Sequence, residues 1–213
     1  MGLPLPKGFF NKPAKQLFIK SRKKTILITG GKQGSHVINQ AIFEIIEKLL
    51  KKYNVIHQTG KSLKTQDHQT ALKIKKHLKS QLATSYFVTD HFTSSAMHDA
   101  IKQADIIISR SGAHIAYELL SLGKPAILIP LPFSYHQEQL KNAKKLSGLN
   151  LASILLQKNL TSKNLLEQVD LISKKLKVYK RIGKTASKTI PQEAEKQVIK
   201  YIQKNFPNDK KTS

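Results

Sequence analysis

The chain has 213 residues, a formal net charge of +24 and no cysteine. That length is enough for one large domain or two very small ones, and 39% hydrophobic against 23% charged residues is a globular composition. The missing cysteines exclude a disulfide scaffold, a thiolate metal site and a cysteine nucleophile. No apolar run approaches the roughly 20 residues that span a bilayer, and we expect no secretory signal in residues 1–10.

The positive charge is unevenly distributed. Residues 1–24 contain seven basic and no acidic side chains, and residues 171–213 contain twelve basic and three acidic ones. Such a field attracts polyanions, which include nucleic acid, anionic lipid headgroups and phosphorylated substrates. A general lysine bias with solvated side chains explains the same counts, and the composition leaves both interpretations open.

In chain order, residues 1–24 are predicted to be a linker or basic arm, and an alternation of strands and helices follows. Short apolar runs predict strands at 25–29, 54–58, 86–88, 105–109, 125–130 and 152–156. Helical spacing or polar helical composition predicts helices at 35–52, 65–82, 95–103, 113–122, 136–147, near 161–177 and at 191–206.

The predicted strands are mostly apolar instead of alternating, which is typical of a parallel sheet covered on both faces. About six strand–helix units predict an α/β fold with a doubly wound, Rossmann-like parallel sheet. We place this ligand-binding domain at 25–177 and a C-terminal helix with a basic tail at 178–213.

The turn after the first predicted strand is rich in glycine. Residues 30–35 read GGKQGS and lead into a helix, with Ser35 as a possible N-cap. Glycines let the backbone approach a ligand, and free N–H groups at a helix start attract a phosphate or diphosphate. The spacing differs from the dinucleotide fingerprint GxGxxG. A glycine-rich turn with a purely structural role remains an alternative.

Two further strand-to-helix turns carry polar side chains. The segment 109–114 (SRSGAH) opens a helix that contains Glu118, whose carboxylate could accept hydrogen bonds from a ribose diol. Glu118 could instead be a solvated helix residue or a partner of Arg110. The segment 136–142 (HQEQLKN) offers amides that suit sugar hydroxyls, or merely a polar first helical turn.

Several motifs of other enzyme classes are absent from the sequence. There is no HExxH zinc motif and no GxSxG nucleophile elbow, and Val55 stands where a P-loop ending at 60–62 would need its first glycine. Aromatic residues are only 7% of the chain and form no RNA-binding signature. We therefore expect no metal site, no cofactor and no specific nucleic acid ligand.

Taken together, the motifs resemble one family. They are ITGGKQGS at 28–35, HQTG at 57–60, AD at 104–105, SRSGA at 109–113, Glu118, GKP at 123–125, Gln139 and NA at 142–143. Their order and spacing resemble the C-terminal, donor-binding half of family 28 glycosyltransferases of GT-B fold. Members of this family transfer N-acetylglucosamine from UDP-N-acetylglucosamine to lipid I in peptidoglycan synthesis. The resemblance runs from about residue 2 to about residue 200.

The resemblance implies roles for individual residues. The diphosphate would lie along Gly31, Lys32, Gln33 and Gly34, beside Arg110, Ser111, Gly112 and Ala113. The uracil would be held at Phe92 and Thr93, the ribose hydroxyls by Glu118, and the sugar by Glu138 and Gln139, with Asn142 supporting their loop. The phosphate and ribose roles agree with the reading of the turns alone, whereas the uracil and sugar roles come only from the family.

The sequence also departs from the family pattern. Lys32 stands where serine is usual, and a small hydroxyl residue is common near 114–115, where this chain has His-Ile. The loop from 92 to 104 is one residue longer than usual, and Gln137-Glu138 replaces a frequent Asp-His. These differences bear on sugar identity more than on UDP binding.

The resemblance implies a donor-binding half that needs a second part. Family members carry an N-terminal acceptor domain with the expected catalytic base, so no catalytic residue is assigned here and an acceptor-domain polypeptide is the expected partner. The implied location is cytoplasmic and peripheral, at the inner face of the plasma membrane, where an anionic surface and a lipid-linked acceptor lie. The alternative is a non-catalytic basic module, or a gene fragment, that binds nucleic acid or anionic membrane.

Overall fold

The computed structural model describes residues 5, 9–14, 17, 22–190, 199–201, 203 and 205. Most of the predicted arm at 1–24 therefore lies outside the described residues. The same holds for much of the predicted helix at 191–206 and for the end of the basic tail. The division into 25–177 and 178–213 stays a prediction.

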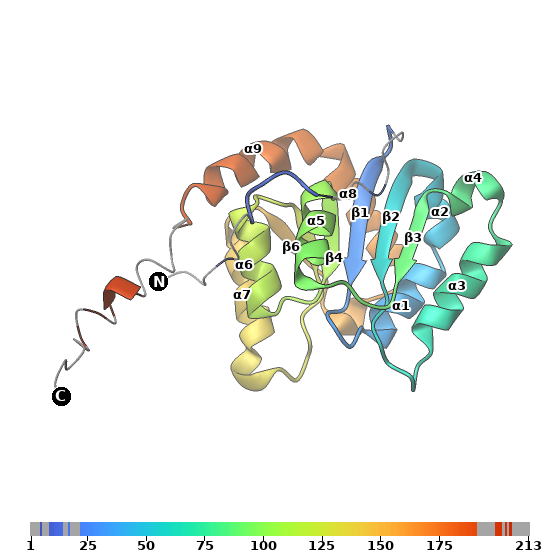
Figure 1. Cartoon of the computed structure of the whole chain (residues 1–213), viewed down its shortest axis with the longest axis horizontal. Helices are drawn as coiled ribbons and strands as arrows, with labels where there is room; N and C mark the ends of the chain where they lie inside the picture. Colours follow the sequence, from blue (N-terminus) through green and yellow to red (C-terminus); the bar gives the residue numbers. More distant parts are fainter. Residues whose placement is uncertain are drawn as a thin grey trace, which may run out of the picture.

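Six parallel strands form one sheet in the order β3-β2-β1-β4-β5-β6 (Figure 1). The strands are β1 (Lys24–Thr29), β2 (Tyr53–Gln58), β3 (Tyr86–Thr89), β4 (Ile106–Ser109), β5 (Ala126–Leu128) and β6 (Ala152–Ile154). This is the strand order of a doubly wound Rossmann-like sheet. The predicted fold class and all six predicted strands are confirmed.

Helices cover both faces of the sheet, as the apolar strands predicted (Figure 1). They are α1 (His36–Phe43), α2 (Ile46–Lys52), α3 (Asp67–His77), α4 (Ser80–Ala83), α5 (Ser94–Gln103), α6 (Ala113–Ser121), α7 (Glu138–Gly148), α8 (Ser162–Lys174) and α9 (Leu176–Ser187). Two 3-10 turns, η1 (Tyr135–Gln137) and η2 (Gln157–Asn159), follow β5 and β6.

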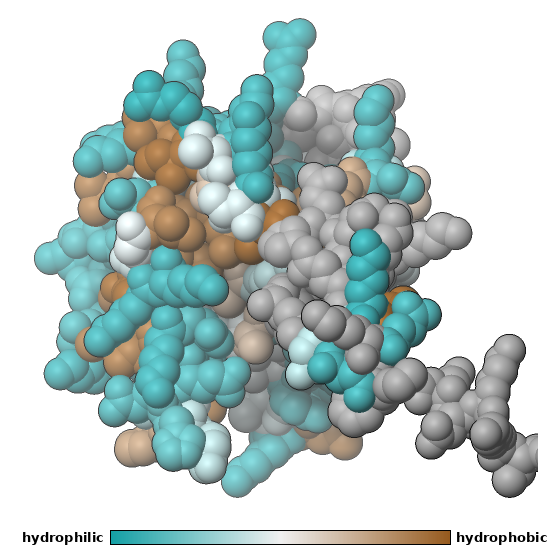
Figure 2. Space-filling model, turned by 90° about the vertical axis from the view of Figure 1, so that its left-hand side faces the viewer, coloured by the Kyte–Doolittle hydropathy of each residue, from teal (hydrophilic) through white to brown (hydrophobic). Residues whose placement is uncertain are grey.

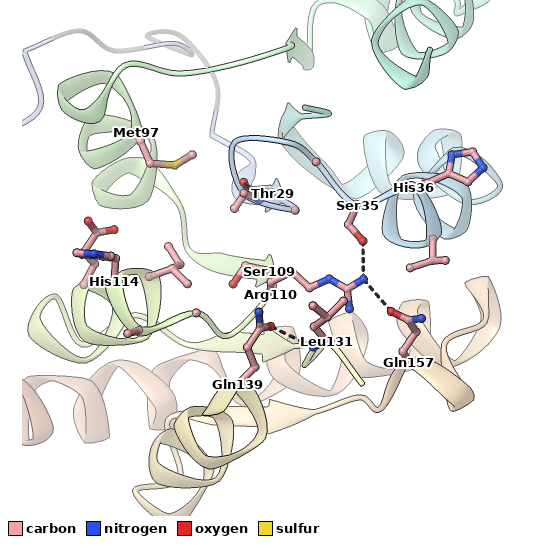
Figure 3. A pocket seen from close by; sticks show the side chains of 18 residues that line it. Thr29, Ser35, His36, Met97, Ser109, Arg110, His114, Leu131, Gln139 and Gln157 are labelled. Atoms are coloured by element: carbon pink, nitrogen blue, oxygen red, sulfur yellow. Dashed lines mark hydrogen bonds between the residues drawn. The ribbon is translucent and has the colours of Figure 1, made fainter. Parts of the chain in front are cut away.

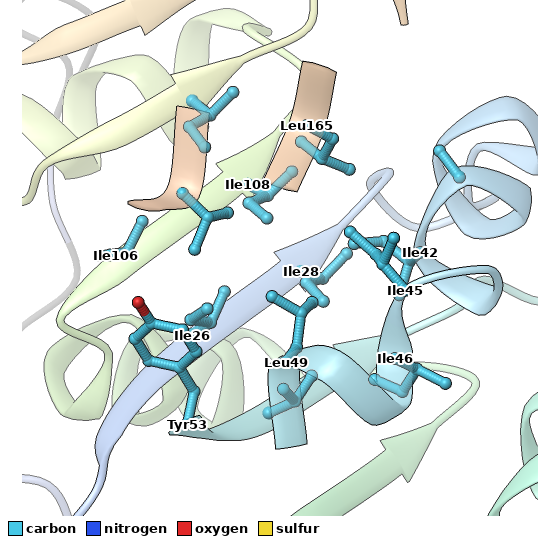
Figure 4. Close-up of a cluster of buried hydrophobic side chains, with 14 of the residues drawn as sticks. Ile26, Ile28, Ile42, Ile45, Ile46, Leu49, Tyr53, Ile106, Ile108 and Leu165 are labelled. Carbon is cyan, nitrogen blue, oxygen red and sulfur yellow. The ribbon is translucent and has the colours of Figure 1, made fainter. Parts of the chain in front are cut away.

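The core has two layers, one on each face of the sheet. Alternate residues of β1 separate them: Ile26 and Ile28 pack with α1, α2 and α8 (Figure 4), whereas Leu27 packs with α5, α6 and α7. All three side chains are fully buried. At about 25 cal/mol per Å² of apolar surface, each contributes roughly 1.5 to 3 kcal/mol relative to an exposed position.

The helix predicted at 35–52 is two helices in the structure. The break lies at Ile45, whose N–H donates to the Ile42 carbonyl at 3.0 Å, three residues back instead of four. Because Ile42, Ile45 and Ile46 are all buried, the apolar pattern continues across the break and gives no signal of it. The helix predicted at 65–82 is likewise divided into α3 and α4.

Helix α9 was not predicted as a separate element. Its buried side includes Gly183 and Ala186, and the Gly183 backbone lies directly against Gly123 at the end of α6. Small residues permit this close approach of backbones. Leu176, Tyr179, Gly183 and Ala186 recur at helical spacing on the packed side, so the sequence carried an amphipathic signal for α9 that the prediction did not use. Ala186 completes a small cluster with Leu120 and Leu151.

A buried polar network holds α1 against β2 and α3. His57 Nε2 donates to Asn39 Oδ1 at 3.0 Å and its Nδ1 accepts from the Tyr86 hydroxyl at 2.9 Å. The Asn39 amide donates to Asp67 Oδ2 and to the Thr59 carbonyl, at 2.8 and 2.9 Å. Every polar atom named here has a partner, so the network fixes α1 without leaving an unsatisfied buried group.

We predict that replacing Gly34 with alanine destabilises the protein. Gly34 has φ of +83°, and an added Cβ would collide with the Thr59 carbonyl oxygen and the Gly60 Cα. The left-handed backbone alone costs about 1 to 3 kcal/mol for a residue with a side chain. Urea denaturation should therefore show at least this loss. Gly148→Ala is the control, because nothing lies within 4 Å of its added Cβ, and an equal loss there would contradict the prediction.

We also predict a pH dependence of stability caused by His57. Burial lowers the pKa of His57 from 6.5 to about 3, so the unfolded chain binds a proton between these values that the folded chain does not. Stability is fully present above pH 6.5 and falls as the pH drops towards 3. The free energy of unfolding should fall less steeply with acid in His57→Gln. The exposed His77→Gln should keep the wild-type slope, and parallel slopes for all three proteins would contradict the prediction.

Candidate functional site

The site lies where β1 and β4 are neighbours but their helices leave in opposite directions. Helix α1 packs on one face of the sheet and α6 on the other, so the two helix starts border a crevice at the carboxyl edge. A cavity of about 620 Å³ occupies this position (Figure 3). Its size suits a small-molecule ligand.

The glycine-rich turn forms one wall of this main cavity. The Gly31 carbonyl accepts from the Gly34 N–H at 3.0 Å and from the Gln58 amide at 2.7 Å, which closes the turn and ties it to β2. Gly31 and Gly34 line the main cavity, and Lys32 lines an adjoining one. Gln33 is exposed and lines neither cavity.

Arg110 crosses the floor of the main cavity and is largely engaged within the protein (Figure 3). Its Nη2 donates to Ser35 Oγ at 2.8 Å and to Gln157 Oε1 at 2.7 Å, and its Nη1 donates to the Ile129 and Pro130 carbonyls at 3.1 and 3.3 Å. Burial lowers the pKa of Arg110 from its ordinary value. The guanidinium therefore joins the starts of α1 and η2 and places a positive charge beneath the cavity.

The second wall is the start of α6. Gly112 is its N-cap residue and Ala113 its first residue, and both line the main cavity. Ser111 is buried, where its hydroxyl donates to the Gln139 carbonyl at 2.8 Å and its carbonyl accepts from the Asn142 amide at 3.1 Å. These bonds attach α7 to the α6 turn.

The third strand-to-helix turn, which follows β5 and contains the segment 136–142, contributes one of its predicted residues to the main cavity. Gln139 lines it, and its side-chain oxygen accepts from the Leu131 N–H at 3.0 Å (Figure 3). Asn142 supports the α6 turn from behind the cavity. Glu138 is exposed at the start of α7 and does not line either cavity.

A second cavity of about 570 Å³ adjoins the first. Gly31, Met97, His114 and Glu118 line both, so the two share a wall. Phe92 lines the second cavity and is stacked on Phe87, with ring centroids 6.0 Å apart. Thr93 instead caps α5 by accepting from the Ala96 N–H at 3.4 Å and lines neither cavity.

Glu118 is neither solvated nor paired with Arg110, the two alternatives that the sequence left open. Its Oε1 accepts from His98 Nε2 at 3.1 Å, and its side chain is 15% exposed. Burial raises the pKa of Glu118, and the nearby His98 and His114 oppose that shift. A carboxylate therefore faces the boundary of the two cavities, well placed to accept hydroxyl hydrogens.

The sequence motifs omit two side chains that hold the charged groups Glu118 and Arg110 in place, and they understate a third. His98 and Gln157 stand 20 and 47 positions from the residues they bond, and no short motif contains either pair. Ser35 is the N-cap residue of α1 as expected, but its hydroxyl accepts from Arg110 and makes no capping bond. Ser35 and Gln157 stand at the start of an element, which is a sequence signal, whereas His98 lies in the middle of α5 and has no such signal.

Within the described residues, no group of three or more histidines and carboxylates is arranged to hold a metal ion. Among the same residues, no helix is long and apolar enough to cross a bilayer. The chemistry that the site does offer is anion binding at two helix starts, with one partly buried cation, one carboxylate and amides for hydroxyl groups.

Relatives are found among curated proteins and solved structures. The UDP-N-acetylglucosamine–N-acetylmuramyl-(pentapeptide) pyrophosphoryl-undecaprenol N-acetylglucosamine transferase of Clostridium botulinum (strain Kyoto / Type A2) is 31% identical over 161 residues, 75% of this chain and 42% of that protein. The enzyme of that name from Desulforamulus reducens is 30% identical over 198 residues, 89% of this chain and 50% of that protein. The chain thus spans half or less of the length of these relatives.

The crystal structure of Acinetobacter baumannii MurG has a TM-score of 0.69 and 25% identity, and the match covers 87% of this chain and 51% of that one. A UDP-GlcNAc 2-epimerase from Neisseria meningitidis, solved with UDP-GlcNAc bound, shares the fold at a TM-score of 0.61 and 18% identity, over 88% of this chain and 46% of that one. The model of the glycosyltransferase family 28 C-terminal domain matches residues 25–201. The chain therefore belongs to the glycosyltransferase family 28 C-terminal domain family.

Proposed function

We propose that the two adjoining cavities bind UDP-N-acetylglucosamine and that the chain is the donor-binding half of an inverting N-acetylglucosaminyltransferase. The observation that carries this proposal is the joint placement of the glycine turn, the α6 start and the Glu118 carboxylate around one crevice. A nucleoside diphosphate offers the matching groups, which are an anionic diphosphate and a ribose diol. The names of the relatives support this donor sugar and lipid I as the acceptor.

In this proposal the diphosphate lies along Gly31 and Gly34 and meets the N–H groups at Gly112 and Ala113. Lys32 supplies a further charge from the second cavity. Transfer of the sugar leaves negative charge on UDP, and helix starts with a nearby cation stabilise such a leaving group without moving. Arg110 acts mainly by holding Ser35 and the start of α1 in position.

The remaining roles follow the family resemblance. Uracil lies in the second cavity against Phe92, near Thr93. Glu118 accepts hydrogen bonds from the ribose hydroxyls. Gln139 faces the sugar, with Glu138 beside it, while Ser111 and Asn142 brace the turn. Gln33 lies on the outer side of the glycine turn, and its contact with the diphosphate would be through the backbone.

A second protein part completes the proposed enzyme. Inverting transfer needs a base that deprotonates the acceptor hydroxyl, and we assign that base to an acceptor-binding polypeptide corresponding to the rest of the relatives' length. We place the assembly in the cytoplasm, peripherally at the inner face of the plasma membrane. The +24 net charge supports a location on an anionic surface, and hydrophilic side chains project from much of the face shown in Figure 2.

Calorimetry with UDP and UDP-N-acetylglucosamine tests the donor site. We expect both to bind, and Glu118→Ala to weaken UDP binding by about 10- to 100-fold, because hydrogen bonds to a charged acceptor contribute about 1.5 to 3 kcal/mol. Glu47→Ala, on the exposed side of α2, is the matched control and should bind UDP as the wild type does. A folded protein that binds neither ligand at millimolar concentration would refute the proposal.

Vesicle sedimentation tests the membrane location. We expect the protein to bind vesicles containing phosphatidylglycerol but not vesicles of phosphatidylcholine alone, since each lysine near an anionic surface contributes about 1 kcal/mol. Binding should be lost between about 0.05 and about 0.5 M salt because screening shortens the range of the attraction. Equal binding to both vesicle types would contradict the electrostatic location.

The high charge also favours the alternative of a basic module that binds nucleic acid. Random-sequence DNA in the same salt series separates the two hypotheses. Salt-sensitive DNA binding together with no affinity for UDP would favour that alternative over the donor site.

A further inference from the structure

The Glu118 carboxylate is held by a side chain from the neighbouring helix. His98 on α5 lies with its Nε2 3.1 Å from Glu118 Oε1 on α6, and the pair joins the two helices that line the second cavity. The His98 and Glu118 side chains are only 10% and 15% exposed. A hydrogen bond so withdrawn from water is weakened little by competing solvent.

The direction of this hydrogen bond is set by its chemistry. An ionised carboxylate only accepts, so His98 Nε2 is the donor and Oε1 is occupied. The second carboxylate oxygen is left to accept from a ligand. Because the terminal torsion of a glutamate side chain has a broad, nearly two-fold profile, a fixed donor on one oxygen is needed to hold the other in one direction.

His98 is itself fixed by the N-terminal segment. The Phe9 ring, only 2% exposed, meets the imidazole edge to face with centroids 5.0 Å apart and an interplanar angle of 78°. Lys102 lies 5.9 Å from the centroid of the same Phe9 ring and 3.8 Å from Asp99. Phe9, which is distant from His98 in the sequence, therefore keeps the Nε2 donor of His98 directed at Glu118.

The pKa of Glu118 is raised overall because burial outweighs the two histidines that favour its ionised form. Burial raises its pKa, whereas the charge and hydrogen bond of His98 and the charge of His114 lower it. Lys32, His91 and Tyr117 are the other titratable side chains that line this cavity. Removing His98 would therefore disturb both the direction and the ionisation of the carboxylate.

We propose that His98 is a positioning residue that aims Glu118 at the ribose hydroxyls of a nucleoside diphosphate and thereby sets the preference for ribose over deoxyribose ligands. The inference rests on the proposed function of the cleft. It adds a residue outside the three strand-to-helix turns, and it gives Phe9 a role in selectivity through its contact with His98.

The test compares the affinities for UDP and for 2′,3′-dideoxy-UDP, which lacks both ribose hydroxyls. Two substitutions with side chains of similar length form a matched pair: His98→Gln keeps an N–H donor, and His98→Met has none. We expect His98→Met to lower the ratio of the two affinities by about 10-fold, the effect of one hydrogen bond to a charged group. His98→Gln should keep the ratio within about 3-fold of the wild type.

The ratio of the two affinities separates a positioning role from general damage to the fold, because a loss of folded protein would weaken the binding of both ligands equally. An unchanged ratio in His98→Met overturns the inference while leaving UDP binding, and the proposed function, intact. An equal loss in His98→Gln and His98→Met also overturns it, since the donor would then be irrelevant. A wild-type protein that does not bind UDP would refute the proposed function and the inference together.

Discussion

The parallel pairing of β1 with β4 is the constraint on which the cleft depends. Ile26 to Thr29 pair with Ile106 to Ser109, so both strands end at the same level. The chain then leaves β1 for one face of the sheet and β4 for the other, and two helix starts are left facing a common crevice. Anion binding at this position follows from backbone geometry and needs few particular side chains.

The charged side chains of the site are supported from within the protein. Arg110 donates to two carbonyls and to the side chains of Ser35 and Gln157, and Glu118 accepts from His98. Burying a charge without such partners would be costly. These bonds also give the site its rigidity, because each one links elements that are not adjacent in the sequence.

Much of the fold was predictable because local residue patterns carry it. Short runs rich in apolar residues identified all six strands, and the parallel sheet followed from them. The break at Ile45 was not predicted because a buried apolar pattern runs through it, whereas α9 was not predicted although its apolar residues recur at helical spacing. The close approach of the Gly183 and Gly123 backbones is likewise something that hydrophobic periodicity does not describe.

For the site, the sequence by itself determined the glycine turn, the α6 start and the presence of Glu118 and Gln139 near the carboxyl edge. The glycine turn, the α6 start and Gln139 lie where strands lead into helices, at the edge where a parallel sheet must gather its loops, and Glu118 lies further along α6. Only the tertiary structure decided that Glu118 is bonded to His98, that Arg110 is held by Ser35 and Gln157, and that Thr93 and Glu138 lie off the cavities. The physical reason is that a side chain's partner depends on the packing of whole helices and strands, and residues far apart in sequence meet only once that packing has formed.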